Sequence, residues 1–263
     1  MEMPAISIKN INKTYIDQDG NEVQALHDIN LDVAEGEFVC IVGPSGCGTS
    51  TLREIVAGLL DATGGEVTLD GQQVHGTSRD IGVVFQDASL FPWRTVRKNV
   101  AFGLEIAGVP KEEREERLKR YISMVSLNGF ENKYPAQLSG GMRQRAGIAR
   151  TLAMNPKVIL MDEPFSAVDH LTKCTLQEEL INIRQAENKT VLFVTHDINE
   201  AVFLADRVVL LSPRPSTIQK IYEIPLEQKR GRNDPLLLKI AAEIAKDINS
   251  GGQDIPNNYW GNL

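Results

Sequence analysis

Residues 43–51 read GPSGCGTST, and this stretch decides the fold. Its glycines follow the pattern G-x-x-x-x-G-K-[ST] of a phosphate-binding loop, in which successive backbone N–H groups point inward at phosphate oxygens. The pattern requires a lysine at position 49, where this chain has Thr49. The stretch therefore predicts a phosphate cradle that lacks its usual cation.

The residues on either side of this loop have the character that the motif requires. Residues 38–42, FVCIV, are continuously apolar, which predicts a strand buried on both faces. Residues 50–60, STLREIVAGLL, predict a helix, whose positive N-terminal end favours an anion. The Ser50 hydroxyl is suited to hold Mg²⁺. The residues of the loop expected to bind the nucleotide are Gly43, Pro44, Ser45, Gly46, Cys47, Gly48, Thr49, Ser50 and Thr51.

The rest of the chain predicts an α/β core with an inserted helical lobe. Alternating apolar residues in 6–33 are typical of antiparallel strands, and residues 64–74 predict a hairpin that turns at Asp70-Gly71. Short apolar runs at 81–86, 158–162, 190–195 and 207–212 predict further strands. We expect one domain over residues 1–263, with a core of about 1–94 and 153–230, a helical lobe of about 95–152, and a C-terminal helix and tail of about 231–263.

Composition excludes several classes of protein. Hydrophobic residues make up 42% of the chain and charged residues 24%, as in ordinary soluble globular proteins. The net charge of −7 argues against a nucleic-acid partner, because the phosphate backbone repels an acidic surface. No apolar run approaches the ~20 residues needed to span a bilayer. If the protein works at a membrane, other chains supply the spanning helices.

Two acidic residues follow a second apolar strand. In VILMDEP, residues 158–164, Asp162 lies where the strand emerges and is suited to hold Mg²⁺ through a water. Glu163 comes next and is suited to polarise an attacking water. A pair of carboxylates after an apolar strand is also common on protein surfaces, so this motif alone is a moderate signal.

A third motif, LSGGMRQR at residues 138–145, distinguishes among proteins with a phosphate-binding loop. Ser139 is a helix-capping residue, and Gly140 and Gly141 leave the first N–H groups of that helix bare, which makes a second anion site. One chain cannot easily fold both sites onto one nucleotide. The pattern therefore favours two chains that face each other and sandwich the nucleotide.

With these motifs in this order, residues 5 to about 225 resemble the nucleotide-binding subunits of ATP-binding-cassette (ABC) transporters. The resemblance implies a RecA-like core with an N-terminal antiparallel β region and a helical lobe, and it implies ATP and Mg²⁺ as ligands. It matches Tyr15 to the aromatic residue that stacks on adenine and His196 to the histidine that grips the γ-phosphate. The remaining roles that it implies are metal and water contact for Gln86, contact with the opposite subunit for Asp169, and nucleotide binding for Ser139, Gly140, Gly141 and Gln144.

Two longer segments indicate a subgroup within this family. SLFPWRTVRKNV (89–100) and NEAVFLADRVVLLSPRP (199–215) are most similar to the importers of nitrate, taurine and alkyl sulfonates. This group implies a second ATPase subunit, separate membrane-spanning permease subunits, an extracytoplasmic solute-binding protein, and a peripheral place on the cytoplasmic face of the membrane. Trp93 would lie where the lobe meets the permease, although a buried tryptophan is an equally fair interpretation.

Thr49 leaves two functions open. The missing ammonium would have bridged β- and γ-phosphate oxygens, and its loss should reduce turnover more than binding. The chain is then a weakened ATPase, or an ATP-gated clamp with negligible hydrolysis; intact Glu163 and His196 favour the first. In a further explanation, the guanidinium of Arg53, four residues after Thr49, replaces the missing ammonium. Against this, that face of the helix normally packs into the core. A further alternative is that Thr49 is an introduced change.

Overall fold

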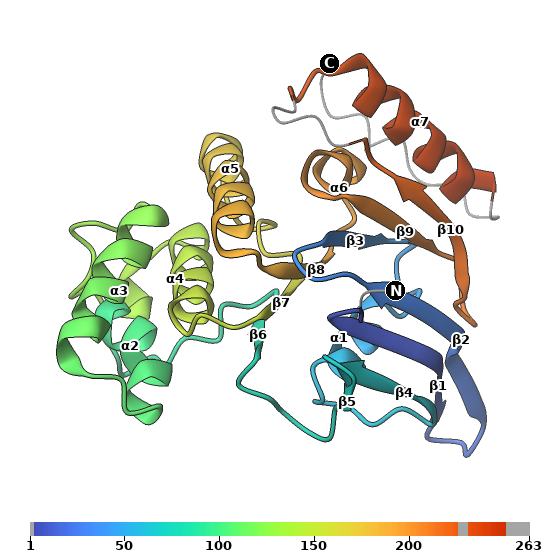
Figure 1. The fold of residues 1–263 in the computed structure, drawn as a ribbon, viewed down its shortest axis with the longest axis horizontal. Helices are drawn as coiled ribbons and strands as arrows, with labels where there is room; N and C mark the ends of the chain where they lie inside the picture. The colour runs from blue at the N-terminus through green and yellow to red at the C-terminus, as the bar shows by residue number, and fades with distance from the viewer. Residues whose placement is uncertain (1–2, 226–230, 251–263) are drawn as a thin grey trace. The chain divides into compact units, whose positions relative to one another are not determined.

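The structure of the chain, a computed structural model, describes residues 3–225 and 231–250 (Figure 1). The chain divides into two compact units. Unit 1 comprises residues 1–78 and 190–263, and unit 2 comprises residues 79–189. The division into core and lobe expected from the sequence remains a prediction.

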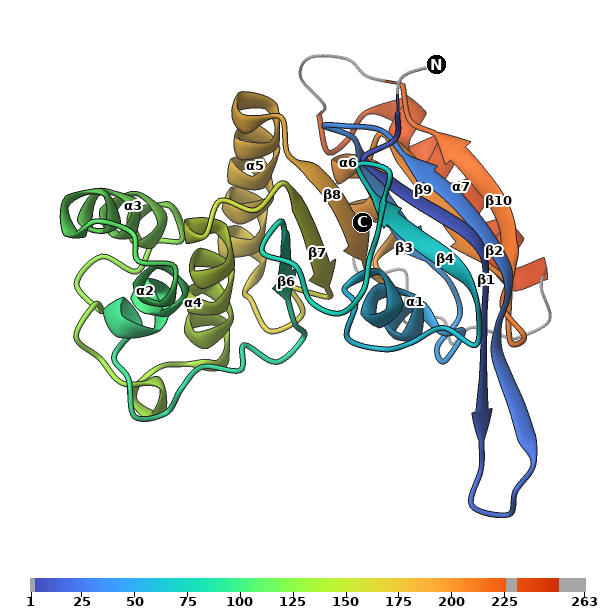
Figure 2. The ribbon, with the colours of Figure 1, turned by 60° about the horizontal axis from the view of Figure 1, so that its bottom comes forward.

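Unit 1 contains an antiparallel sheet with the strand order β2-β1-β4-β5. Its strands are β1 (Ile6–Ile16), β2 (Glu22–Val33), β4 (Gly64–Leu69) and β5 (Gln72–Gln73). The pairing of Ile8 with Leu31 brings two buried side chains opposite each other, as the alternation predicted. Figure 2 shows β1 and β2 as a long hairpin. The turn predicted at Asp70-Gly71 is confirmed, since both residues have positive φ and join β4 to β5.

The second sheet region of unit 1 is mainly parallel. Strand β3 (Phe38–Val42) lies between β8 (Thr190–Val194) and β9 (Arg207–Leu211) and is parallel to both, and β10 (Ile218–Glu223) is antiparallel to β9. All five residues of β3 are buried, as the continuous apolar run predicted. Because the strand is covered on both faces, its carboxyl end delivers the phosphate loop from a rigid support.

Three helices complete unit 1: α1 (Thr49–Val56), α6 (Ile198–Leu204) and α7 (Pro235–Ser250). Helix α7 packs on α6 (Figure 1). Leu237, Ala241, Ile244 and Ile248 are buried, so apolar residues that recur at helical spacing form the packed face of α7. The predicted tail after this helix lies outside the described residues.

Unit 2 combines a pair of parallel strands with helices. Strand β6 (Ile81–Val84) pairs with β7 (Val158–Asp162). Helix α4 (Gly140–Ala153) contacts β6, α2 (Val96–Ile106) and α3 (Lys111–Met124). Leu118 and Ile122 of α3 are buried with Val125, which directly follows the helix, so α3 packs through one apolar face. A short 3₁₀ turn, η1 (Pro135–Gln137), precedes α4, and α5 (His170–Glu187) follows β7.

Two predicted boundaries are wrong. The helix expected over 50–60 ends at Val56, because Gly58 adopts a left-handed φ of 67° and the Leu59 N–H turns back to the Glu54 carbonyl. The strand expected to reach Gln86 ends at Val84, where its pairing with Met161 of β7 stops. Gln86 is therefore in the loop after the strand. Within the described residues, no helix has the length and apolarity to cross a membrane.

Candidate nucleotide-binding site

The phosphate loop joins the carboxyl end of β3 to the N-terminus of α1. Gly46 and Gly48 have φ angles of 77° and 103°, which L-residues with a side chain rarely adopt. Gly48 is also closely packed, since a Cβ there would lie 3.0 Å from Leu26 of β2. The Leu52 N–H donates to the Gly48 carbonyl, so the loop ends directly in the first turn of α1. Gly46 and Gly48 are thus required because the loop backbone at these two positions disfavours any residue with a side chain.

The start of the loop is packed from inside. A Cβ on Gly43 would lie 2.7 Å from the Cys47 sulfur and 3.2 Å from the Leu211 carbonyl oxygen at the end of β9. Cys47 is 2% exposed, and burial raises the pKa of its thiol. The Cys47 side chain therefore fills the space beneath the loop, and a glycine at position 43 is needed to accommodate it.

Thr49 is the first residue of α1. Its backbone N–H and hydroxyl hydrogen-bond to the Cys47 sulfur, and this contact only partly offsets the effect of burial on the Cys47 pKa. A threonine in this position supplies no positive charge, so the backbone N–H groups of the loop and the N-terminal end of α1 are the groups left there that favour an anion.

Arg53 lies one turn after Thr49 on the buried face of α1. The residue is 4% exposed, and its Nη2 is 3.2 Å from Oε1 of Glu54. The ion pair directs the guanidinium to the neighbouring carboxylate. The Arg53 face of the helix therefore packs into the core, which argues against a contact between Arg53 and phosphate. Compensation by Arg53 for the missing lysine stays a hypothesis.

Tyr15 lies near the end of β1 in unit 1 and is 38% exposed. Its hydroxyl is 3.2 Å from the Thr51 hydroxyl, which ties the ring to the first turn of α1. The Lys13 ammonium lies 5.2 Å from the centre of the ring. The structure thus brings together Tyr15 and the helix that follows the phosphate loop, and leaves the aromatic ring partly open for stacking.

His196 is exposed and follows β8 in unit 1. The segment beside it is well fixed: the Thr195 hydroxyl donates to Glu200, and the Asp197 N–H donates to the Thr195 hydroxyl oxygen at 3.1 Å. Asp197 in turn caps α6 by accepting from the Glu200 N–H. These bonds hold the backbone on both sides of the histidine.

In unit 2 the two carboxylates and Gln86 come from neighbouring strand ends. Asp162 is the last residue of β7 and is 6% exposed, whereas Glu163 is half-buried. Gln86 Nε2 lies 3.3 Å from Glu163 Oε2, with the amide as donor. Glu163 has a φ of 42°, which is uncommon for a residue with a long side chain and is found most often at functional sites.

The third motif forms the start of α4, as predicted. Ser139 is the N-cap, and its hydroxyl oxygen accepts from the Met142 N–H at 3.3 Å. A Cβ on Gly141 would lie 2.8 Å from the Ala167 carbonyl oxygen, so glycine allows the loop after β7 to approach α4. Gln144 is 2% exposed and donates to the Phe85 carbonyl at 2.8 Å. Its side chain therefore supports the segment that carries Gln86.

Asp169, predicted to contact an opposite subunit, is the N-cap of α5 and accepts from the Thr172 N–H at 3.1 Å. That hydrogen bond lowers the pKa of the Asp169 carboxyl. The residue is exposed and ionised at neutral pH. The cap fixes its position while leaving the carboxylate accessible.

The site residues fall into one set per unit. Unit 1 carries Tyr15, the phosphate loop and His196, and unit 2 carries Gln86, Asp162, Glu163, Ser139 and Asp169. Within the described residues, no group of three or more His, Cys, Asp or Glu side chains is placed to hold a metal. In unit 2 the Asp162 carboxylate and the Gln86 amide oxygen are ligand types that Mg²⁺ accepts, and in unit 1 the Ser50 hydroxyl is another.

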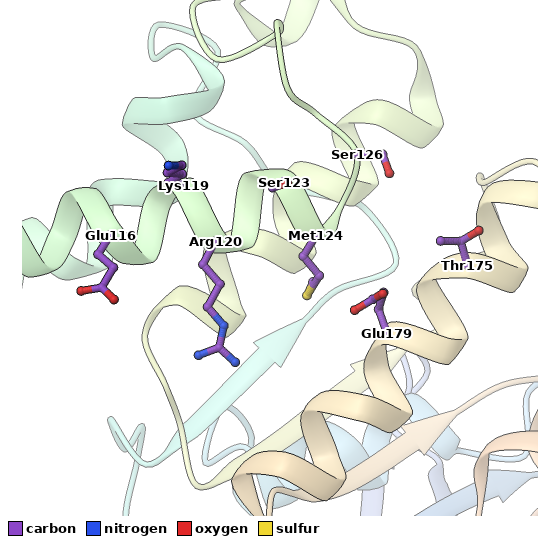
Figure 3. Close-up of a pocket in the computed structure, with 8 residues that line it drawn as sticks. All are labelled: Glu116, Lys119, Arg120, Ser123, Met124, Ser126, Thr175 and Glu179. Carbon is purple, nitrogen blue, oxygen red and sulfur yellow. The ribbon is translucent and has the colours of Figure 1, made fainter. Parts of the chain in front are cut away.

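A cavity of about 590 Å³ in unit 2 contains none of these residues. Figure 3 shows side chains of α3, among them Arg120 and Met124, facing Thr175 and Glu179 of α5 across it. The cavity is lined by both acidic and basic residues. The cavity is therefore separate from the candidate nucleotide-binding site in unit 2.

These observations define a nucleotide-binding cassette, and comparison with known proteins gives its family. Residues 26–166 match the ABC transporter family model, which is more than half of the chain. The chain belongs to the ABC transporter family, as an ATP-binding protein.

Several curated relatives match over nearly their whole length. An uncharacterized ABC transporter ATP-binding protein of Methanocaldococcus jannaschii is 53% identical over 91% of this chain and 89% of its own. The nitrate import ATP-binding protein NrtD of a Synechocystis species is 46% identical, with 92% and 91% covered. The aliphatic sulfonates import ATP-binding protein SsuB of Bacillus cereus is 40% identical, with 94% and 97% covered. The resemblance to the nitrate and sulfonate group is confirmed.

Solved structures confirm the fold. A dimeric ATP-binding cassette in a post-hydrolysis state bound to ADP and Pi has a TM-score of 0.77 and 36% identity, covering 84% of this chain and 100% of that one. A second dimeric structure, described as a bacterial ABC transporter cassette, has a TM-score of 0.78 with the same identity and coverage. The P-loop NTPase fold predicted from the sequence is therefore correct.

Proposed function

We propose that the chain is the ATP-hydrolysing subunit of a bacterial-type importer of small, anionic solutes such as nitrate, taurine or sulfonates. The observation that carries this proposal is the phosphate loop, with left-handed Gly46 and Gly48 between a fully buried strand and α1. The nitrate and sulfonate import proteins among its relatives support the solute class.

The residues have separate tasks in this proposal. The loop N–H groups and the N-terminus of α1 bind the phosphates, and Tyr15 stacks on the base. Ser50, Asp162 and Gln86 hold Mg²⁺, which neutralises charge that develops on the phosphates. Glu163 accepts the proton of the attacking water, and His196 donates to the γ-phosphate. Because Thr49 lacks the bridging ammonium, turnover is slow.

Two copies of the chain form the working pair. Ser139 and the bare N–H groups of Gly140 and Gly141 bind the phosphates held by the partner copy, and Asp169 contacts that copy. The dimeric cassettes among the similar structures support this arrangement.

Separate permease subunits dock on unit 2 near Trp93, at the cytoplasmic face of the membrane, and an extracytoplasmic protein delivers the solute. Trp93 is 71% exposed, so the alternative in which it is buried is wrong. Its ring lies 5.6 Å from that of Phe91, which in turn packs on Phe102 of α2. The supported aromatic surface fits a protein partner.

The second candidate is an ATP-gated clamp with negligible hydrolysis, which Thr49 favours. The two candidates share ATP binding and differ in turnover. Titration with Mg·ATP, followed by the melting temperature, tests what they share, because a ligand that binds only the folded state stabilises it. No rise at millimolar Mg·ATP contradicts both.

A further inference from the structure

The turn at residues 212–217, between β9 and β10, contacts the phosphate loop at Cys47. Ser216 of this turn is fully buried, and its hydroxyl donates a hydrogen bond to the Cys47 carbonyl. Both residues belong to unit 1 and are 169 positions apart in the sequence. Nothing in the sequence motifs connects them.

The backbone of Ser216 is itself anchored. Its N–H donates to the Ala25 carbonyl at 3.0 Å, and its carbonyl accepts from the His27 N–H at 2.8 Å. These two hydrogen bonds form an isolated parallel β-bridge between Ser216 and Leu26 of β2. The hydroxyl that meets the loop is therefore presented from a fixed position.

The carbonyl that Ser216 holds determines the direction of an N–H group. The peptide unit between Cys47 and Gly48 is planar, and in a trans unit the C=O and N–H bonds point in opposite directions. A carbonyl directed at Ser216 therefore turns the Gly48 N–H away from it, toward the concave side of the loop. In the described residues, the Gly48 N–H donates to no backbone acceptor.

Gly48 alone does not fix this orientation. Its φ of 103° lies in the positive region, which glycine populates about as readily as the negative one. The peptide unit between Cys47 and Gly48 therefore needs an external contact to remain in one orientation. Cys47 is 2% exposed, and a buried carbonyl without a donor is unfavourable. The Ser216 hydroxyl, which also lies 3.0 Å from the Ser212 carbonyl oxygen of its own turn, is the donor that meets both requirements.

We propose that Ser216 is a positioning residue of the nucleotide site, which aims the Gly48 N–H at a phosphate by holding the Cys47 carbonyl. The inference rests on the proposed ATP-binding function. In a loop that lacks the cation at position 49, the affinity for phosphate depends more heavily on such N–H donors.

The test compares Mg·ADP binding by calorimetry in the unmodified chain, Ser216→Ala and Ser212→Ala. Ser212 is the matched control, because its hydroxyl oxygen accepts from the Thr217 N–H at 3.0 Å within the same turn and does not reach the loop. We expect Ser216→Ala to weaken ADP binding about two- to tenfold, as for the loss of one hydrogen bond. Ser212→Ala should bind ADP as the unmodified chain does, even if both variants lower the melting temperature equally.

A second variant guards against misfolding of the first. Ser216→Cys is close in size and keeps only a weak donor, so it should also weaken ADP binding. ADP affinity that is unchanged in both Ser216 variants, or reduced equally in Ser212→Ala, overturns the proposal. If the unmodified chain binds no ADP, the proposed function fails, and that result is distinguishable from a failure at Ser216.

Discussion

The side-chain amide of Gln86 donates a hydrogen bond to the carboxylate of Glu163, with 3.3 Å between Nε2 and Oε2. The two residues are 77 positions apart and follow the neighbouring parallel strands β6 and β7. Since parallel strands end at the same edge of a sheet, pairing of these strands brings the two side chains together. A neutral donor orients the carboxylate without neutralising it, as a general base requires.

Glu163→Gln should lower ATP turnover by roughly 100-fold or more, because the amide cannot accept a proton from water. Nucleotide binding should persist, and a dimer should accumulate in Mg·ATP. Phosphate release and light scattering measure the two effects. Glu66→Gln, which changes an exposed carboxylate on β4, serves as the control and should alter neither.

Thr49→Lys should raise turnover roughly tenfold or more and change ATP affinity less, because a cation between the β- and γ-phosphates helps most as transition-state charge develops. Steady-state kinetics separate the two parameters. If Arg53 already supplies the cation, Thr49→Lys gains little and Arg53→Leu abolishes the activity that exists. Because Arg53 is paired with Glu54, we expect Thr49→Lys to raise turnover.

Ser139 has two roles that substitutions can separate. Ser139→Ala removes the N-cap of α4 and should cost about 1 kcal/mol of stability, whereas Ser139→Asn keeps an acceptor and should restore most of it. Both variants lose the hydroxyl that we propose to face the partner's nucleotide, so neither should dimerise fully in ATP. Melting temperature reports the first role and light scattering the second. An Asn variant that dimerises like the unmodified chain would show that Ser139 acts only as a cap.

Tyr15→Ala should weaken ATP binding roughly tenfold or more if the ring stacks on the base, and Tyr15→Phe should retain it. The Phe variant loses only the partly exposed hydrogen bond to Thr51, which contributes little. Calorimetric titration distinguishes the two. Equal losses in both variants would assign the effect to the hydroxyl and not to stacking.

Local signals predicted much of this fold. The apolar run at 38–42, the glycines at 46 and 48 and the cap at Ser139 each specify backbone within a few residues, and the structure has them where expected. Contacts between distant segments were not predictable. Ser216 meets Cys47 across 169 positions and Gln144 meets Phe85 across 59, and hydrophobic periodicity carries no information about either pair. The predicted ends of α1 and β6 were wrong because a glycine conformation and a strand pairing, rather than apolar pattern, set them.

The central claim is that this cassette binds and hydrolyses ATP without the phosphate-loop lysine. Phosphate release from Mg·ATP by the unmodified chain tests it most directly, with a chelated sample and Glu163→Gln measured alongside. The account predicts slow release that disappears on chelation and in the Glu163 variant. Release that persists in both samples, or its complete absence from the unmodified chain, would contradict it.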